Sequence, residues 1–377
     1  MKSFKKCWGL LMLCMLICLA AQTVAHAEGT PAFNSLRELQ SYLQDCIKER
    51  RQTVNFILKD ANALEMSNDA LGQELVQMSA QLVQCRTNMD RQQAGQIEIR
   101  MEMVYRQGIR IADAWKGGDT NGLSTEEVDT LHRAEKIVEE VKQSASNAMS
   151  VEKALHDRLC RELVYQDMIR DDSITEPQRV LSAVGALMDG VANCQGYSDA
   201  FYLLGTMAGL QVDFQCGYDS ENRAHVWNTI CLDGRWYALD VTADDPMGND
   251  LPPGIPNYIS FNLGRDFCAG VLSWPEHWEV SDIADQSDKH YYLSEDSLEF
   301  GRDFTDLESM AKCVYNRRAE NGQEIVYTLF MGESPSEDEI NAAIKKEAER
   351  HSKAASWRFW YWDRGIRTYY IFQWTEF

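Results

Sequence analysis

Two β-rich runs meet at Asp233-Gly234, and this pair constrains the fold more tightly than any other short stretch of the sequence. An Asp-Gly pair between such runs is a strong signal for a two-residue hairpin turn. If these two residues form the turn, Leu232 pairs with Arg235, and every later pairing follows by counting. The sequence therefore predicts an antiparallel hairpin of fixed register.

The predicted register brings a histidine and an aspartate to one face of the hairpin. Counting back from the turn places Trp227 opposite Asp240, which makes His225 the diagonal neighbour of Asp240. Diagonal neighbours lie roughly 7–8 Å apart at the backbone, within reach of these two side chains. A slip of one residue would put them on opposite faces.

A cysteine precedes the hairpin at the expected start of an apolar helix. Cys194 lies in Val-Ala-Asn-Cys-Gln-Gly-Tyr-Ser-Asp-Ala-Phe, and apolar residues recur at helical spacing over 199–208. A thiol at a helix start faces unpaired N–H groups and the positive end of the dipole, and both favour thiolate. Gly196 lets the backbone fold tightly beside the sulfur. Thiol, imidazole and carboxylate in this order are the parts of a cysteine nucleophile with its base and orienting group.

Three separated motifs together resemble the core of the transglutaminase-like superfamily, a papain-related fold with a Cys-His-Asp triad. They are Cys-Gln-Gly-Tyr-Ser-Asp-Ala-Phe, His-Val-Trp-Asn and Asp-Gly-Arg-Trp-Tyr-Ala-Leu-Asp-Val-Thr, and the resemblance covers roughly residues 150–300. It implies Cys194 as nucleophile, His225 as general base and Asp240 as orienting group. Ala243 stands where many relatives carry an aromatic residue.

The implied activity is acyl transfer through a Cys194 thioester on peptide or protein amides. Water as acceptor would make the protein a protease or amidase, and a lysine amine would make it a crosslinking transamidase. A non-catalytic extracellular protein that binds peptides or glycans on the same fold is the alternative, because a fold does not fix a function. A binder needs no activated thiol.

Five residues beside the triad are candidates for substrate binding. Three aromatic residues, Tyr197, Trp227 and Trp236, are expected to line the cleft. Packing beneath the hairpin is the alternative for Trp227. The backbone N–H of Cys194 is the natural oxyanion donor. Asn193 and Gln195 are the candidates for a second donor.

The N-terminus has the pattern of a cleaved export signal. A basic start and an apolar run lead to Ala25-His26-Ala27, an A-x-A cleavage site, and the run is too short for a membrane span. Cleavage leaves 34 basic against 58 acidic residues, a net charge of −24. This surface argues against nucleic-acid and anionic-membrane partners. We expect a secreted, periplasmic or cell-surface bacterial protein that acts on a peptide or protein substrate. Peptides, envelope proteins and peptidoglycan stem peptides are the alternatives for that substrate.

The cysteine count argues against a full disulfide framework. Eight cysteines remain after cleavage, and if Cys194 is free seven are left, an odd number. No Cys-x-x-Cys spacing with histidines is present, so neither a metal nor another cofactor is expected. Gly118 to Gly122 has some likeness to a calcium loop but lacks the ligand spacing, and a turn before a helix cap is the preferred interpretation.

The fold class expected is α+β, with the papain-like core flanked by smaller α+β modules. The expected parts are a signal peptide (1–27), an N-terminal module (28–112), a helical connector (113–150), the catalytic core (151–300) and a C-terminal module (301–377). Helix and strand patterns recur in the two modules, including a Gly-Ile-Arg match at 108–110 and 365–367, which suggests a repeat. His156 is expected to be structural, and the aromatic residues of 357–374 to be core. The oligomeric state is not predicted.

Overall fold

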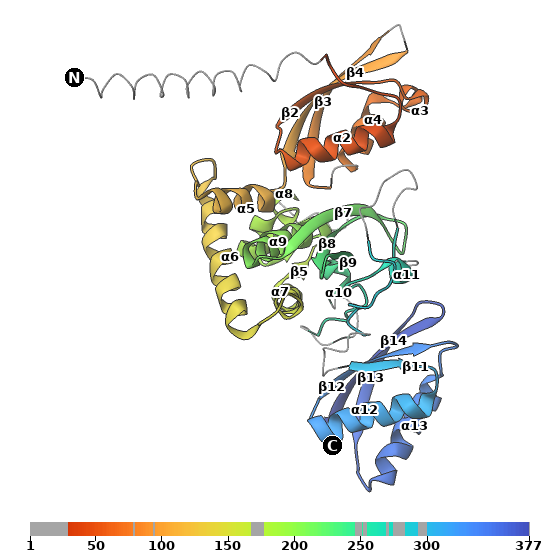
Figure 1. Cartoon of the computed structure of the whole chain (residues 1–377). Coiled ribbons are helices and arrows are strands. Elements are labelled where there is room, and N and C mark those ends of the chain that lie inside the picture. Colours follow the sequence, from red (N-terminus) through yellow and green to blue (C-terminus); the bar gives the residue numbers. More distant parts are fainter. Residues whose placement is uncertain are drawn as a thin grey trace, which may run out of the picture. The chain divides into compact units, whose positions relative to one another are not determined.

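The structure is a computed structural model that describes residues 29–77, 80–92, 95–166, 177–245, 251, 255–268, 271–273, 283–292 and 300–376. The predicted export signal lies outside these residues. The described chain divides into two compact units. The first unit ends at Val104 and excludes Ala80–Val83. The second unit consists of Ala80–Val83 together with the described residues from Tyr105 onward (Figure 1). The segment bounds expected from the sequence within these units stay predictions.

The first unit is built on a sheet of strand order β1-β2-β4-β3. Its elements are β1 (Ala32–Phe33), α2 (Leu36–Lys48), β2 (Thr53–Leu58), α3 (Ala61–Glu65), α4 (Asn68–Gln77), β3 (Leu82–Gln92) and β4 (Gln96–Tyr105). The sequence pattern of 68–86 predicts one helix, and this is wrong in its second half, because β3 begins at Leu82. The alternation of apolar and polar residues over 96–104 predicts a half-buried strand, and alternate burial along β4 confirms it.

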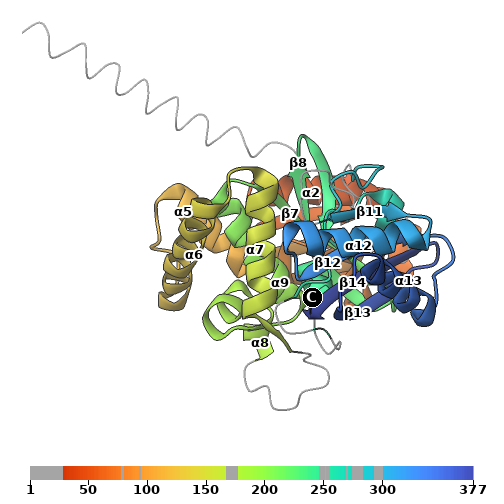
Figure 2. The same cartoon turned by 90° about the horizontal axis from the view of Figure 1, so that it is seen from below.

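The second unit begins with helices that surround one central helix. The elements are α5 (Gln107–Gly117), α6 (Thr125–Ser144), α7 (Ala148–Glu162), β5 (Val164–Tyr165), α8 (Pro177–Val180), the π-helix Gly185–Asp189, β6 (Val191–Ala192) and α9 (Cys194–Ala208). Helix α9 packs against α5, α6 and α7 (Figure 2). Twelve of its fifteen residues are buried, as expected of a helix that is apolar on nearly every face. The sequence Ser124-Thr-Glu-Glu127 has the pattern of a capping box, and the structure confirms this box at the start of α6.

A four-stranded antiparallel sheet, of order β10-β7-β8-β9, covers one side of α9. Its strands and the short helices beside them are β7 (Gln211–Asp219), β8 (Ala224–Leu232), β9 (Arg235–Leu239), α10 (Val241–Asp244), α11 (Arg265–Cys268) and β10 (Leu272–Ser273). Leu232 pairs with Arg235 in the structure, which confirms the predicted hairpin register. Asp233 and Gly234 have φ angles of 51° and 79°, the positive values that a two-residue type I′ turn requires.

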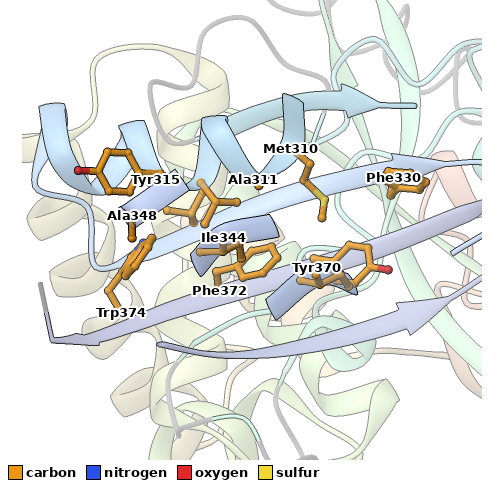
Figure 3. Packing of buried hydrophobic residues seen from close by; sticks show 12 residues of the cluster. Met310, Ala311, Tyr315, Phe330, Ile344, Ala348, Tyr370, Phe372 and Trp374 are labelled. Carbon is orange, nitrogen blue, oxygen red and sulfur yellow. The ribbon is translucent and has the colours of Figure 1, made fainter. Parts of the chain in front are cut away.

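The C-terminal part of the second unit carries its own sheet and two helices. The elements are β11 (Phe300–Phe304), α12 (Leu307–Asn321), β12 (Ile325–Met331), α13 (Glu337–Arg350), β13 (Ser356–Asp363) and β14 (Arg367–Glu376). Both helices bury apolar side chains against one sheet face, where Ile344, Tyr370 and Phe372 lie at the centre (Figure 3). The other face contributes Tyr327 and Tyr369 to an aromatic cluster with Tyr258, Tyr291 and Tyr292 of the core. The aromatic residues of β14 are therefore core residues, as predicted. The prediction is wrong for Tyr361 of β13, which is exposed.

The N-terminal and C-terminal modules share one topology. Strand order is β1-β2-β4-β3 in the first and β11-β12-β14-β13 in the second, with the first two strands parallel in each. The Gly-Ile-Arg match does not belong to this correspondence. Gly108 lies near the start of α5, after the fourth strand of its module, whereas Gly365 lies in the turn between β13 and β14.

Candidate active site

Cys194 is the first residue of α9, and its neighbour Asn193 caps the helix. The Asn193 Oδ1 accepts the backbone N–H groups of Gln195 (3.0 Å) and Gly196 (3.4 Å). These are two of the amides that a helix start leaves unpaired. No hydrogen bond of the Cys194 N–H is found among the described residues. The half-buried thiol therefore lies beside an available N–H donor at the positive end of a helix.

Gly196 is required for a close approach of two backbones. A Cβ at this position would lie 2.4 Å from the Val180 carbonyl oxygen and 2.9 Å from the Ala192 Cβ. The prediction that Gly196 allows the backbone to fold tightly at this position is thus confirmed. The reason is steric contact with the preceding segment.

His225 is the second residue of β8, and Asp240 directly follows the last residue of β9. The His225 Nε2 lies 2.6 Å from the Asp240 Oδ2, across the hairpin as the register predicted. The other carboxylate oxygen, Oδ1, accepts the Ala243 N–H at 3.2 Å and caps α10. The Asp240 N–H donates to the Ser260 carbonyl at 3.0 Å. Asp240 is 99% buried, so its position is fixed on every side.

The environment of His225 favours a protonated ring. Burial alone lowers the pKa of His225, but the Asp240 charge, the Asp240 hydrogen bond and the interaction with the Cys194 sulfur outweigh it, and the pKa lies well above its ordinary value. Because Nε2 is bonded to Asp240, the ring presents Nδ1 to the thiol. An imidazolium between a carboxylate and a thiol is the arrangement that keeps a cysteine nucleophile as thiolate.

Two polar side chains brace the helix that carries Cys194 against the strand that carries His225. The Asn228 Nδ2 donates to the backbone oxygens of Ser198 and Asp213, each at 3.2 Å. The Ser198 Oγ donates to the Val226 oxygen at 3.1 Å. The spacing between thiol and imidazole is therefore held by contacts one turn away from the thiol.

Asp199 ties the same helix to α5, a role that the sequence did not predict. Its carboxylate accepts the backbone N–H groups of Gly108 (3.0 Å) and Ala183 (2.8 Å). A Cβ at Gly108 would lie 2.6 Å from the Asp199 Oδ1, so only glycine fits there. Burial raises the pKa of Asp199 to about 6. No local pattern reveals the contact with α5, because Gly108 and Asp199 are 91 residues apart.

A cavity of about 690 Å³ opens over the three residues. Its wall comes from the ends of β7 and β8, from α10 and the segment that follows it, and from the β13–β14 hairpin. The lining residues are Tyr165, Cys194, Asp219, Ser220, Arg223, Ala224, His225, Asp240, Thr242, Ala243, Asn257, Ile259, Ser260, Val271, Leu272, Trp362 and Arg364. The structure thus brings Cys194, His225 and Asp240 together in one pocket. Ala243 lies on its wall.

The five predicted substrate-binding residues have other surroundings than the cavity. Tyr197 is fully buried, and its hydroxyl donates to Asp245. Trp227 is 1% exposed and stacks on the His225 ring at a centroid distance of 6.0 Å. Trp236 pairs with Cys231 on the hairpin. The remaining two are the Asn193 cap and Gln195, whose Oε1 accepts Arg106 at 3.2 Å. None of the five is among the lining residues.

A second, wholly buried histidine lies beneath α10. The His156 Nε2 lies 3.2 Å from the Asp244 Oδ2, and its Nδ1 lies 3.0 Å from the Asp157 Oδ1. Burial lowers the pKa of His156, but Cys160, Asp157 and Asp244 outweigh it and raise the pKa well above the ordinary value. Asp244 also accepts the Ser260 N–H at 2.7 Å. The structural role predicted for His156 is confirmed, since it holds the end of α10 opposite Asp240.

Three further features concern metals, membranes and disulfides. Among the described residues, no three His, Cys, Asp or Glu side chains cluster in a way that could hold a metal ion. Over the same residues, no helix is both long and apolar enough to cross a membrane. Among the described residues, none of the eight cysteines takes part in a disulfide.

Comparison with known proteins gives a family for the central region. The transglutaminase-like superfamily matches residues 135–241, a range that contains Cys194, His225 and Asp240. No curated protein matches the sequence.

Three solved structures resemble the chain at low identity. One is described as a TGase, with 12% identity over 60% of this chain and 62% of that one, and a TM-score of 0.30. A putative cysteine protease from Cytophaga hutchinsonii has 10% identity over 43% and 63%, with a TM-score of 0.27. A putative protease from Parabacteroides distasonis has 8% identity over 85% and 65%, with a TM-score of 0.26. The chain spans less than two thirds of the length of each.

Proposed function

From the premise that residues 135–241 form a transglutaminase-like domain, we propose that this protein is a cysteine acyl-transfer enzyme acting on peptide or protein amides. The observation that carries the proposal is the 2.6 Å contact of His225 with Asp240 in the cavity that also exposes Cys194. The residues are, in order, the nucleophile, the acid-base group and the group that orients it.

The reaction begins with the Cys194 thiolate and a protonated His225. The sulfur attacks the amide carbon, and the C–S bond forms while the carbonyl electrons move to the oxygen. The Cys194 N–H, unpaired among the described residues, is placed to donate to that oxyanion. When the oxyanion collapses, the C–N bond breaks and the His225 proton passes to the leaving amine. A thioester and a neutral imidazole remain.

The second half of the reaction transfers the acyl group. The neutral His225 takes a proton from water or from an incoming amine as that acceptor attacks the thioester carbon. The C–S bond then breaks and thiolate and imidazolium are restored. Water gives a protease or amidase, and a lysine amine gives a crosslinker. We also propose that the enzyme works outside the cytoplasm, on the basis of the export-type sequence at residues 1–27.

The test is the rate at which iodoacetamide labels each cysteine as a function of pH, mapped by peptide mass spectrometry. Cys194 should react rapidly well below pH 8, and His225→Ala should reduce it to the rate of an ordinary thiol. Cys231, half-buried on the same hairpin, is the internal control. Slow labelling of Cys194 in the wild type would contradict the proposal and favour the non-catalytic binding protein.

Activity itself is tested with Cys194→Ala. This variant should lose amide hydrolysis and amine incorporation by a factor of about 10³ or more, since no nucleophile remains. It should keep the wild-type circular dichroism spectrum. The matched variant Cys231→Ala should keep full activity. Turnover that survives in Cys194→Ala would exclude the thioester mechanism.

A further inference from the structure

The β13–β14 hairpin of the C-terminal module supplies part of the cavity wall. Trp362, the second-last residue of β13, and Arg364, in the turn, line the same cavity as Cys194 and His225. The turn is well defined. The Asp363 Oδ1 accepts the Gly365 N–H at 2.9 Å, the Arg364 N–H donates to the Arg367 oxygen at 2.7 Å, and Gly365 has a φ of 74°.

The hairpin is also anchored to the core. The Arg367 guanidinium lies 3.8 Å from the centre of the Phe267 ring, in helix α11 of the core. Next to Arg367 along β14, Thr368, Tyr369 and Tyr370 are all buried. The two wall residues therefore project from a strand pair that is fixed at its base, so their positions at the cavity are determined by the fold.

Outside the triad, the charges on the described wall do not balance. Asp219 is the one acid there, and Arg223 pairs with it at 2.8 Å. Burial raises the pKa of Asp219, but hydrogen bonds from Arg223 and Glu221 outweigh it and hold the pKa below its usual range. Asp219 is therefore a carboxylate paired with Arg223, which also forms an ion pair at 3.3 Å with Glu221, a residue outside the lining set. Among the described residues Arg364 has no ion-pair partner, so this lining residue adds one unmatched positive charge to the wall.

This excess of positive charge on the cavity wall is opposite in sign to the net charge of the protein. The chain carries 58 acidic against 37 basic residues, a net charge of −21. An unmatched arginine next to an aromatic ring, at the mouth of a reactive site, is a combination that binds carboxylates. The guanidinium donates paired hydrogen bonds to a carboxylate, and the indole face packs on the adjoining peptide.

We infer that Trp362 and Arg364 form an acyl-donor subsite that selects substrates with a carboxylate close to the reacting amide. This inference rests on the proposed function and adds the substrate class to it. An acidic peptide, with a glutamate or aspartate side chain or a free terminal carboxylate near the amide, is the chemistry that this wall recognises.

The first experiment compares two alkylating agents of similar size. Iodoacetate carries a carboxylate and iodoacetamide does not, so the ratio of their rates at Cys194 measures attraction of an anion to the reacting sulfur. Arg364→Gln should lower this ratio about threefold, and added salt should lower it in the wild type. A general effect of Arg364 on the thiolate would change both rates equally and leave the ratio constant.

The matched control is Lys345→Gln, which removes the same charge from the same module at an exposed site on α13. It should leave the ratio at the wild-type value. A ratio that is unchanged in Arg364→Gln, or lowered equally in Lys345→Gln, would overturn the inference. Failure of the proposed function would give another result, since Cys194 of the wild type would then react slowly with both iodoacetate and iodoacetamide.

The second experiment uses peptides with an N-terminal chloroacetyl group that differ only in a neighbouring glutamate or glutamine. The wild type should be modified faster by the glutamate peptide, and Arg364→Gln should lose this preference. Trp362→Ala should slow both peptides while leaving the iodoacetamide rate unchanged, since the small reagent does not need the indole face. Equal rates for the two peptides with the wild type would contradict the inference.

Discussion

Asp240 has a separate task for each of its carboxylate oxygens. One oxygen holds the His225 ring, and the other caps α10 through the Ala243 N–H. Substitution by asparagine separates these tasks, because asparagine caps a helix as well as aspartate but carries no charge. Substitution by alanine removes both.

We predict that Asp240→Asn slows alkylation of Cys194 roughly ten- to a hundredfold near neutral pH, the value of a charge-assisted hydrogen bond. The carboxylate raises the pKa of His225, so its loss lowers that pKa. Cys194 reacts faster than an ordinary thiol only while His225 is protonated. In Asp240→Asn this advantage should therefore disappear at a lower pH than it does in the wild type. The measurement is the pH profile of labelling.

The same pair of variants tests stability. A raised histidine pKa stabilises the fold below the unfolded-state pKa, and this contribution is lost as pH rises through the folded-state value. Asp240→Asn should remove that contribution and otherwise unfold like the wild type, whereas Asp240→Ala should lose about 1 kcal/mol more for the missing cap. Equal unfolding of the two variants in urea would contradict the capping role.

Glu152, buried on α7, gives a second prediction at the residue scale. Burial raises its pKa from 4.5 to about 8, although it accepts a hydrogen bond from Asn262 at 3.2 Å. Between these two pH values the unfolded chain ionises and the folded chain does not, so stability is lost as pH rises from 4.5 to 8.

Glu152→Gln should remove this loss. It should unfold like the wild type at pH 4 and be more stable at pH 8, by on the order of 1–3 kcal/mol in urea titrations. The exposed Glu320→Gln is the control and should show no such difference between the two pH values. A Glu152→Gln variant that gains nothing at pH 8 would show that Glu152 is charged in the folded protein.

At the scale of elements, the start of α9 joins local stability to reactivity. Asn193→Ala removes the side chain that accepts two helix N–H groups. We predict a loss of about 1–2 kcal/mol in unfolding free energy and slower labelling of Cys194, because the first turn frays at the thiol. Ser124→Ala, which removes the cap of α6, should cost a similar stability without changing the labelling rate.

Elements with strong local signals were predictable from the sequence. The Asp233-Gly234 turn fixed the register because both residues adopt positive φ, and the apolar spacing after Cys194 predicted α9 from its first residue. Strand β3 was missed because apolar residues recur through 82–92 in a pattern that also fits a helix. The contacts of Asp199 with Gly108 and of His156 with Asp244 could not be predicted, since these partners lie far away in sequence.

At the scale of the whole molecule, an aromatic cluster joins the C-terminal sheet to the core within the second unit. Tyr327 lies 5.2 Å from Tyr258 and 5.4 Å from Tyr291 between ring centres, and its hydroxyl donates to the Pro256 carbonyl at 3.1 Å. The positions of Trp362 and Arg364 on the cavity wall depend on this packing of the C-terminal sheet against the core. The sequence placed them in a separate module, because no local pattern records such packing.

We predict that Tyr327→Phe lowers the melting temperature by a few degrees. The change leaves the Pro256 carbonyl unpaired in a buried site, at a cost of about 1 kcal/mol. Tyr361→Phe, at a position 47% exposed, is the matched control and should melt like the wild type. A Tyr327→Phe variant with unchanged melting would show that water replaces the lost bond.

Asp240 and Cys194 differ in how much they contribute to the fold, and this difference affects how the sequences of related proteins should be interpreted. Asp240 and the residues around it also hold the fold together, so a relative without the proposed catalysis would still be under selection to keep them. Among the described residues, the side chain of Cys194 forms no hydrogen bond beyond the one with His225. In a survey of genomes, the residue at the position of Cys194 should therefore distinguish catalytic from non-catalytic relatives. The presence of the surrounding motifs should not.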